Sequence, residues 1–304
     1  MSQFWDNFPE IEEGYKIDFH QGNTPVSRAT VGDTSVFIKD ENLNPNGSFK
    51  DRGLSYQVAR HIQQGKTDFA LSSSGNAAIS AAYLASKYKI TLNLFLSSNI
   101  KVSKLNKISR FSEENENILI HTSLTPRSDL IKFVNSNTGI VNLRGSTDDF
   151  AMPGYKTIAY ELLAQVPEID AVFIPCSSGT SSLGIYEGFK ERSAKVQIHI
   201  CQTAKVNTIA KKFDKNFTVA KTSLADAITD KVALRRNQIE DMISKSKGYA
   251  WVVADEQLTI SRAITRSWGE EEYSYNSLLA LGGFNKALQR GLHFNFPVLL
   301  LSGA

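Results

Sequence analysis

Short apolar runs alternate with longer helix-like stretches along this chain, and this alternation constrains the fold more than any other feature. The predicted strands are 69–71, 91–96, 118–120, 171–174, 196–201, 251–254 and 298–301, and the predicted helices include 77–87, 102–111, 128–135 and 183–192. Strands that are apolar throughout are typical of parallel sheets, because helices cover both faces of such sheets. The alternation therefore predicts an α/β fold built from βα units around mostly parallel sheets.

Composition and charge exclude several classes of protein. The chain has 304 residues, a length that suits two domains or one large α/β unit, and its formal net charge is +3. Because the sequence holds no dense basic stripe, nucleic acid is not an expected partner. Cys176 and Cys201 form no CxxC pair, and no bound metal is expected. No signal-peptide pattern is present, and no apolar run approaches the roughly 20 residues that cross a bilayer, so we expect a cytoplasmic protein without membrane contact.

Two turns rich in serine and glycine each follow a predicted strand. The first, 72–76, comes after the strand that ends at Leu71, and the second, 177–182, comes after Pro175. Ligands in open α/β sheets bind beyond the carboxyl ends of strands, where the N–H groups of the following helix favour an anion. The alternative is that these residues only cap their helices. Neither turn matches GxGxxG or the Walker motif, so the sequence predicts neither a dinucleotide site nor a Walker-type ATP site.

Lys50 lies in the segment 47–53, which reads GSFKDRG. Pro45 and Gly47 predict a loop that leads into a helix, and the lysine lies at their junction. A single lysine in such a place is usually a solvated surface residue. Any functional interpretation therefore depends on the residues around it.

The lysine segment closely resembles the cofactor-lysine motif of the fold-type-II (tryptophan-synthase-β-like) pyridoxal-phosphate enzymes, and of threonine synthases in particular. Further motifs similar to those of this family follow in the same order: GNTP at 22–25, SSGNAA at 73–78, IKVSKL at 100–105, GYKT at 154–157, SSGTS at 177–181 and SG at 302–303. Of these motifs only the lysine segment is specific by itself. Their shared order over nearly the whole chain argues against chance.

The resemblance implies a role for each matched residue. Lys50 would hold pyridoxal 5′-phosphate (PLP) as a Schiff base and later move protons, and Phe49 would pack near the cofactor ring. Asn76 would hydrogen-bond the 3′ oxygen of the cofactor, and Ser302 would meet the ring nitrogen with a neutral hydroxyl. The cofactor phosphate would be held by Ser177, Ser178, Gly179, Thr180 and Ser181, and the substrate by Ser73, Ser74, Gly75, Lys101 and Lys156.

The sequence departs from the family pattern in three places. Threonine synthases carry a phosphate-binding arginine shortly before the GQKT motif, but 149–153 reads DFAMP and Arg144 is out of register. The usual Glu-Pro of the late helix is replaced in 270–277 (EEEYSYNS), where the tyrosines either reshape the pocket or pack in the core, and we favour packing. Ser302 lies two residues before the last residue of the sequence, where chains fray, so we expect it to be loosely held.

The fold implied by the resemblance has two domains of mostly parallel twisted sheets flanked by helices, with PLP between the domains. A small domain is expected at about 53–145, and a large, phosphate-binding domain at 1–52 plus 146–304. A polar stretch, 144–154, is expected to join the two halves. The resemblance also implies a homodimer.

The leading functional hypothesis is a PLP-dependent carbon–oxygen lyase resembling threonine synthase, which converts O-phospho-L-homoserine and water to L-threonine and phosphate. A serine/threonine ammonia-lyase, or another β-elimination or β-replacement enzyme of the same fold, is the alternative, and the missing arginine is its main support. A non-catalytic protein that retains this fold is a third possibility. In the first two cases the partner is a small amino-acid substrate.

Overall fold

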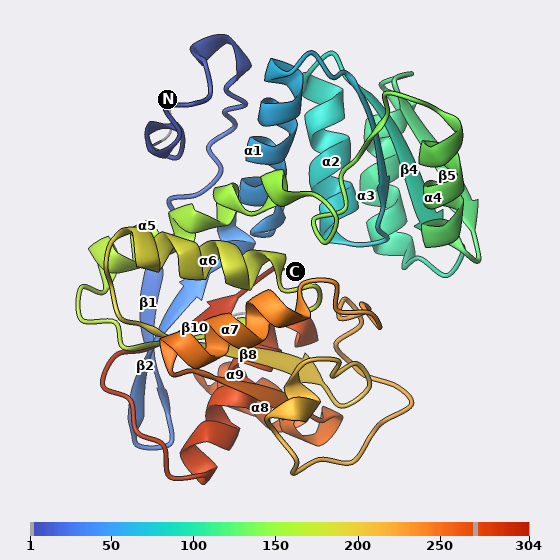
Figure 1. The fold of residues 1–304 in the computed structure, drawn as a ribbon. Coiled ribbons are helices and arrows are strands. Elements are labelled where there is room, and N and C mark those ends of the chain that lie inside the picture. Colours follow the sequence, from blue (N-terminus) through green and yellow to red (C-terminus); the bar gives the residue numbers. More distant parts are fainter. Residues whose placement is uncertain (1–2, 270–272, 304) are drawn as a thin grey trace. The chain divides into compact units, whose positions relative to one another are not determined.

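The computed structural model describes residues 3–269 and 273–303, and the chain divides into two units (Figure 1). Unit 1 comprises 1–22 and 44–154, and unit 2 comprises 23–43 and 155–304. The border at Gly154 falls at the end of the polar stretch that was expected to join two halves. Unit 1 is larger than the small domain expected at 53–145.

The sheet of unit 1 is parallel throughout, with the strand order β5-β4-β3-β6. Its strands are β3 (Asp68–Ser72), β4 (Thr91–Ser97), β5 (Ile118–Ser123) and β6 (Val141–Asn142), and its helices are α1 (Lys50–Gln63), α2 (Asn76–Lys87), α3 (Val102–Glu113) and α4 (Pro126–Ser136). Alternate strand residues face opposite sides. Phe69 and Leu71 join the core beneath α1 and α2, whereas Ala70 and Phe95 pack with Leu130 of α4. Helices therefore cover both faces, as the apolar strands predicted.

The N-terminal segment belongs to unit 1, whereas the sequence interpretation had placed it in the large domain. Phe4, Trp5, Phe8, Ile11 and Ile17 are buried in the same core as the side chains of α1 and α2. Trp5 Nε1 also donates a hydrogen bond of 3.0 Å to the Ile17 carbonyl. Burial of this much apolar surface, rather than any regular element, is what attaches the segment to unit 1.

The sheet of unit 2 has the strand order β1-β2-β10-β7-β8-β9. Its strands are β1 (Val26–Val31), β2 (Thr34–Asp40), β7 (Ala171–Pro175), β8 (Gln197–Thr203), β9 (Tyr249–Val253) and β10 (Pro297–Leu301). β1 and β2 form an antiparallel hairpin, which the sequence interpretation did not predict, and the other pairings are parallel. The four predicted strands of this unit are confirmed as β7, β8, β9 and β10.

Helices cover both faces of this sheet as well (Figure 1). They are α5 (Lys156–Gln165), α6 (Thr180–Glu191), α7 (Arg236–Ser246), α8 (Asp255–Ser267) and α9 (Tyr275–Gln289), and the short 3-10 turns of the chain are Trp5–Asn7, Glu13–Tyr15, Glu41–Leu43, Asp149–Ala151, Pro153–Tyr155 and Ala210–Lys212. α8 and α9 pack on one face, where Phe284 and Leu258 meet Phe173, Trp251 and Leu299. α6 and α7 pack on the other face.

Among the residues that the structure describes, no helix is both long enough and apolar enough to cross a membrane. Nor do the residues that the structure describes bring together three or more histidine, cysteine, aspartate or glutamate side chains that could hold a metal ion.

His199 on β8 is buried and stacks on the ring of Phe173, with a centroid distance of 4.4 Å. Trp251 Nε1 donates to His199 Nδ1 at 3.2 Å, so the neutral ring carries its proton on Nε2. That Nε2 has no hydrogen-bond partner among the described residues. Burial lowers the pKa of His199 to about 3.

We expect the free energy of unfolding to fall as the pH drops from 6.5 towards 3, because in that window the unfolded chain binds a proton at His199 that the folded chain does not. With about 1.4 kcal/mol for each unit of pKa difference, the loss due to His199 reaches about 2 kcal/mol at a pH of about 5. Denaturant unfolding of the wild type and of His199→Phe across this pH range measures it. The variant should show the shallower decline, and equal declines would contradict the expectation.

Candidate active site

Two predicted cofactor contacts lie at the same edge of the unit 2 sheet. β10 and β7 are parallel neighbours, with Val298 opposite Val172 and Leu299 opposite Phe173. Ser302 follows the carboxyl end of β10, and the turn that begins at Cys176 follows the carboxyl end of β7. Ligands of open α/β sheets bind at this edge. The structure therefore brings Ser302 and the predicted phosphate loop to the place where a ligand is expected.

The predicted phosphate loop has the form that close approach of an anion requires. Gly179 has a φ of +85°, and α6 begins at the next residue, Thr180. This left-handed conformation strains any residue with a Cβ, and a Cβ atom here would also lie 2.0 Å from Cδ1 of Ile239, so the position favours glycine. The hydroxyls of Ser178 and Thr180 are 3.0 Å apart. Hydroxyls and helix-terminal N–H groups are donors suited to a phosphate, and the loop thus fits the phosphate of PLP.

Ser177 is the exception within this loop. Its Oγ donates to the Asp230 carboxylate at 2.9 Å and accepts from the N–H groups of Thr229 and Asp230 at 3.2 and 3.3 Å. A hydroxyl has one proton and two lone pairs, so these bonds occupy its full capacity. The Ser177 side chain thus anchors the 226–230 segment, which leaves Ser178 to Ser181 as the candidates in this loop for holding a phosphate.

Ser302 is firmly held, in contrast to the expectation of a frayed end. It is 8% exposed, and the backbone of the following residue, Gly303, is bound by two hydroxyls of the α9 region. Ser277 Oγ accepts from Gly303 N at 3.1 Å and donates to Gly303 O at 2.8 Å, and Ser274 Oγ donates to the same carbonyl at 2.5 Å. Hydrogen bonds from the α9 region therefore hold this segment in place.

In unit 1, Lys50 is half-buried at the first position of α1. Its Nζ lies 4.8 Å from the centroid of the Phe49 ring, and Phe49 is itself buried. The next residue, Asp51, is fully buried, and its carboxylate accepts from Asn46 N at 2.8 Å and from Ser80 Oγ of α2 at 2.5 Å. Asp51 thus fixes the loop before Lys50 and ties the start of α1 to α2, which begins at Asn76. The backbone that carries Lys50 is thereby fixed, and its primary amine is the group that forms a Schiff base with an aldehyde cofactor.

The predicted substrate turn lies between β3 and α2, at the carboxyl edge of the unit 1 sheet. Ser74 Oγ accepts from Ser97 N at 2.7 Å, which joins the turn to the end of β4 and leaves the Ser74 hydroxyl proton as a donor. Gly75 N donates to Ser73 Oγ at 3.3 Å. The turn is therefore held from within and from the neighbouring strand.

Lys104 is a candidate site residue that sequence reasoning did not single out. Its Nζ donates to Asn76 Oδ1 at 3.3 Å, and it lies 3.9 Å from the position of a Cβ atom at Gly75. Lys104 belongs to the run 100–105 and lies three residues after Lys101, about one helical turn further along the chain. This spacing could have identified Lys104 as a site candidate from the sequence, because residues three apart on a helix are neighbours. The structure places a cation directly at the predicted substrate turn.

Lys101 and Lys156 were also predicted to bind the substrate. Lys101 is exposed at the start of α3. Lys156 at the start of α5 forms an ion pair with Glu191 of α6. The carboxylate of Glu191 therefore balances the charge of Lys156 within unit 2. Tyr273 and Tyr275 are partly buried against the core, so the packing interpretation is confirmed. The neighbouring glutamates, 270–272, lie outside the described residues.

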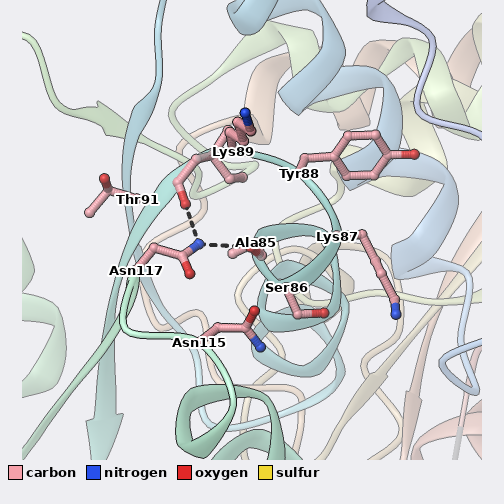
Figure 2. Close-up of a pocket in the computed structure, with 9 residues that line it drawn as sticks. Ala85, Ser86, Lys87, Tyr88, Lys89, Thr91, Asn115 and Asn117 are labelled. Carbon is pink, nitrogen blue, oxygen red and sulfur yellow. Dashed lines mark hydrogen bonds between the residues drawn. The ribbon is translucent and has the colours of Figure 1, made fainter.

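Unit 1 also has a surface hollow (Figure 2). It is lined by Ala85, Ser86, Lys87, Tyr88, Lys89, Ile90, Thr91, Asn115 and Asn117. Asn117 Nδ2 bridges the carbonyls of Ala85 and Ile90 at 2.8 and 2.6 Å. The hollow thus surrounds the carboxyl end of α2, whereas Asn76 is at the opposite end of that helix, and it contains none of the predicted site residues.

Several known proteins are similar to this chain. The threonine synthase of Methanocaldococcus jannaschii is 25% identical over 95% of this chain and 76% of its own length, and that of Methanosarcina acetivorans is 28% identical over 58% of this chain but only 44% of its own length. Among solved structures, maize serine racemase superposes with a TM-score of 0.81 at 21% identity, covering 98% of this chain and 92% of the racemase. A fungal L-serine ammonia-lyase from Rhizomucor miehei gives 0.76 at 17% identity, covering 93% and 94%.

The family model described as "Pyridoxal-phosphate dependent enzyme" matches residues 17–271. The match includes Lys50, the turn at 73–76 and the phosphate loop, and the solved structures share the fold of both units. The chain therefore belongs to the family of pyridoxal-phosphate dependent enzymes.

Proposed function

We propose that this enzyme is a lyase of the threonine-synthase type, which converts O-phospho-L-homoserine and water to L-threonine and phosphate. The similarity to the threonine synthase of Methanocaldococcus jannaschii over 95% of the chain supports this substrate. The single structural observation that carries the proposal is the position of Lys104 at the turn formed by Ser73 to Asn76. That turn is suited to a carboxylate, and a cation beside it suits a substrate that carries a second anionic group.

Bound PLP supplies an electron-withdrawing ring that stabilises negative charge at the Cα of the substrate. In our proposal, Lys50 holds the cofactor, and its Nζ then removes the Cα proton and returns protons later in the reaction. The hydroxyl of Ser74 donates to the substrate carboxylate, and the amide of Asn76 orients the ring. Ser178 to Ser181 hold the cofactor phosphate, and Ser302 meets the ring nitrogen. A neutral hydroxyl at that nitrogen favours the unprotonated ring, which suits elimination and replacement reactions. We further propose a homodimer as the assembly.

The proposal predicts that the purified enzyme with PLP releases inorganic phosphate from O-phospho-L-homoserine and forms threonine in equal amount. Lys104→Met should weaken the use of this substrate by about tenfold or more in kcat/KM, because it removes one charge-assisted hydrogen bond. Lys107→Met is the matched control, since Lys107 is an exposed lysine one helical turn further along α3 and should leave kcat/KM unchanged. Absence of phosphate release by the wild type would show that this substrate is wrong.

A serine/threonine ammonia-lyase or related β-elimination enzyme is the second candidate. It is favoured by the sequence of 149–153, which lacks the arginine that binds the substrate phosphate in threonine synthases. The fold is shared with an L-serine ammonia-lyase and with a serine racemase, so the same preparation should be tested with L-serine and L-threonine. Formation of a keto acid would support the ammonia-lyase, and formation of D-serine would support a racemase.

A further inference from the structure

Ser302 is held by contacts on both its N-terminal and its C-terminal side within unit 2. On its N-terminal side, Ser302 continues β10, in which Leu300 and Leu301 pair with Lys39 and Asp40 of β2. On its C-terminal side, both backbone polar groups of Gly303 bind hydroxyls from the start of α9. The residue pairs of β10 end at Leu301, and Gly303 takes part in one further β-bridge. The bonds to the serines of α9 add to this backbone pairing in fixing the direction of the Ser302 side chain.

Ser277 makes the decisive contacts. Its Oγ accepts from Gly303 N at 3.1 Å and donates to Gly303 O at 2.8 Å, and the side chain is fully buried. Gly303 N belongs to the planar peptide that joins Ser302 to Gly303, so these bonds anchor the chain just after Ser302. Together with the pairing of Leu301, they fix the N, Cα and C atoms of Ser302 and hence the direction of its Cα–Cβ bond. Gly303 has a φ of +150°, a conformation available to glycine, and this turns its carbonyl towards Ser274 and Ser277.

Helix capping does not explain Ser277. The N-cap of α9 is Ser274, whose Oγ accepts from Ser277 N at 3.3 Å, and this is the ordinary role of a serine at a helix start. A serine inside a helix usually bonds a carbonyl of its own preceding turn or faces water. Ser277 instead directs its hydroxyl across to a residue 26 positions away in the sequence. The contact therefore serves the segment after β10 rather than the helix.

We propose that Ser277 is a positioning residue that aims the Ser302 hydroxyl at the ring nitrogen of PLP. This inference rests on the proposed role of Ser302. Ser277 touches neither cofactor nor substrate, and it acts through the Gly303 backbone. Replacing it with alanine removes both of its bonds to Gly303 and frees the segment after Leu301 to move. The Cα–C bond of Ser302, and with it the Cα–Cβ bond that carries the hydroxyl, then loses its fixed direction, while the phosphate loop and Lys50 stay intact.

A double-mutant cycle with spectroscopic readout tests this proposal. The absorption of the lysine-bound cofactor, and its change with pH, report on the hydrogen bond at the ring nitrogen. Ser277→Ala should shift this spectrum in the same direction as Ser302→Ala, and should raise the apparent dissociation constant for PLP by about fivefold, the effect of losing one hydrogen bond. Because both substitutions remove the same contact, the double variant should be no weaker than the single ones.

Ser261→Ala is the matched control. Ser261 is an equally buried serine of unit 2, on α8, and its Oγ bonds the carbonyl of Gln257 in its own helix. Its replacement should leave the cofactor spectrum unchanged. If Ser277→Ala lowers stability too far for study, Ser274→Ala, which removes one of the two bonds to the Gly303 carbonyl, should give a smaller shift of the same sign.

Two results would overturn the inference while leaving the cofactor assignment intact. One is additivity of Ser277→Ala and Ser302→Ala, and the other is a Ser277→Ala spectrum equal to that of Ser261→Ala. A wild-type protein that forms no lysine-bound cofactor band in the same titration would instead refute the proposed roles of both Lys50 and Ser302, and the inference with them. The two failures are therefore distinguishable in one experiment.

Discussion

Lys50→Ala is expected to abolish covalent attachment of PLP and to lower turnover of the substrate by at least about 10³-fold, in the upper part of the range for a lost acid–base residue. Lys50 is half-buried at the start of α1, next to the buried ring of Phe49. The buried carboxylate of Asp51, bound to Asn46 and Ser80, fixes this helix start relative to α2. The substitution removes the predicted cofactor-binding amine itself, so the loss should be nearly complete.

Borohydride reduction of the PLP-loaded protein, followed by peptide mapping, measures the attachment directly. The modified residue should be Lys50 in the wild type, and Lys50→Ala should show neither a modified peptide nor the visible band of the bound cofactor. Lys66→Ala, which changes an exposed lysine just after α1, is the control and should behave like the wild type. A modified lysine other than Lys50 would overturn the site assignment, and a colourless wild type would favour the non-catalytic alternative.

The sequence predicted those parts of the fold and site that depend on local pattern. Apolar runs identified the strands β7 and β10, and the turns that follow them placed Ser178 to Ser181 and Ser302 at one sheet edge, because parallel neighbours share their carboxyl edge. The start of α6 at Thr180, three residues earlier than predicted, lies within the serine-rich turn, where hydrophobic periodicity gives no signal.

The features that the sequence could not predict depend on contacts between distant segments. β1 reads VSRATV and is largely exposed, so its pairing with β2 leaves no apolar run to recognise. The bond from Ser177 to Asp230 spans 53 positions, and that from Ser277 to Gly303 spans 26. The sequence does not distinguish a serine that faces a ligand from a serine that anchors a loop. Only the residue that the hydroxyl contacts in the folded chain distinguishes them.

Gly179→Ala should weaken non-covalent binding of PLP by at least about 30-fold, which corresponds to about 2 kcal/mol. A left-handed conformation costs a residue with a Cβ about 1–2 kcal/mol, and forcing an extra methyl into packed surroundings costs about 1–3 kcal/mol more. Gly179 has a φ of +85°, and its Cβ would lie 2.0 Å from Cδ1 of Ile239 on α7. The Ile239 side chain can shift to admit the methyl group, but the left-handed backbone of Gly179 remains strained for a residue with a Cβ. We expect the loop to relieve this strain by changing its conformation, which turns the N–H groups at the start of α6 away from the phosphate.

The affinity is best measured in the Lys50→Ala background, where no covalent bond masks the contribution of the phosphate. Gly291→Ala is a closely matched control, because Gly291 also lies in unit 2 with a φ of +76°, yet its Cβ would meet nothing within 4 Å. That variant should lose some stability through backbone strain and bind PLP as the parent does. Unchanged PLP affinity in Gly179→Ala would mean that the phosphate binds elsewhere. A loss confined to Gly179→Ala would instead assign the phosphate to the loop between β7 and α6, independently of any chemistry at Lys50.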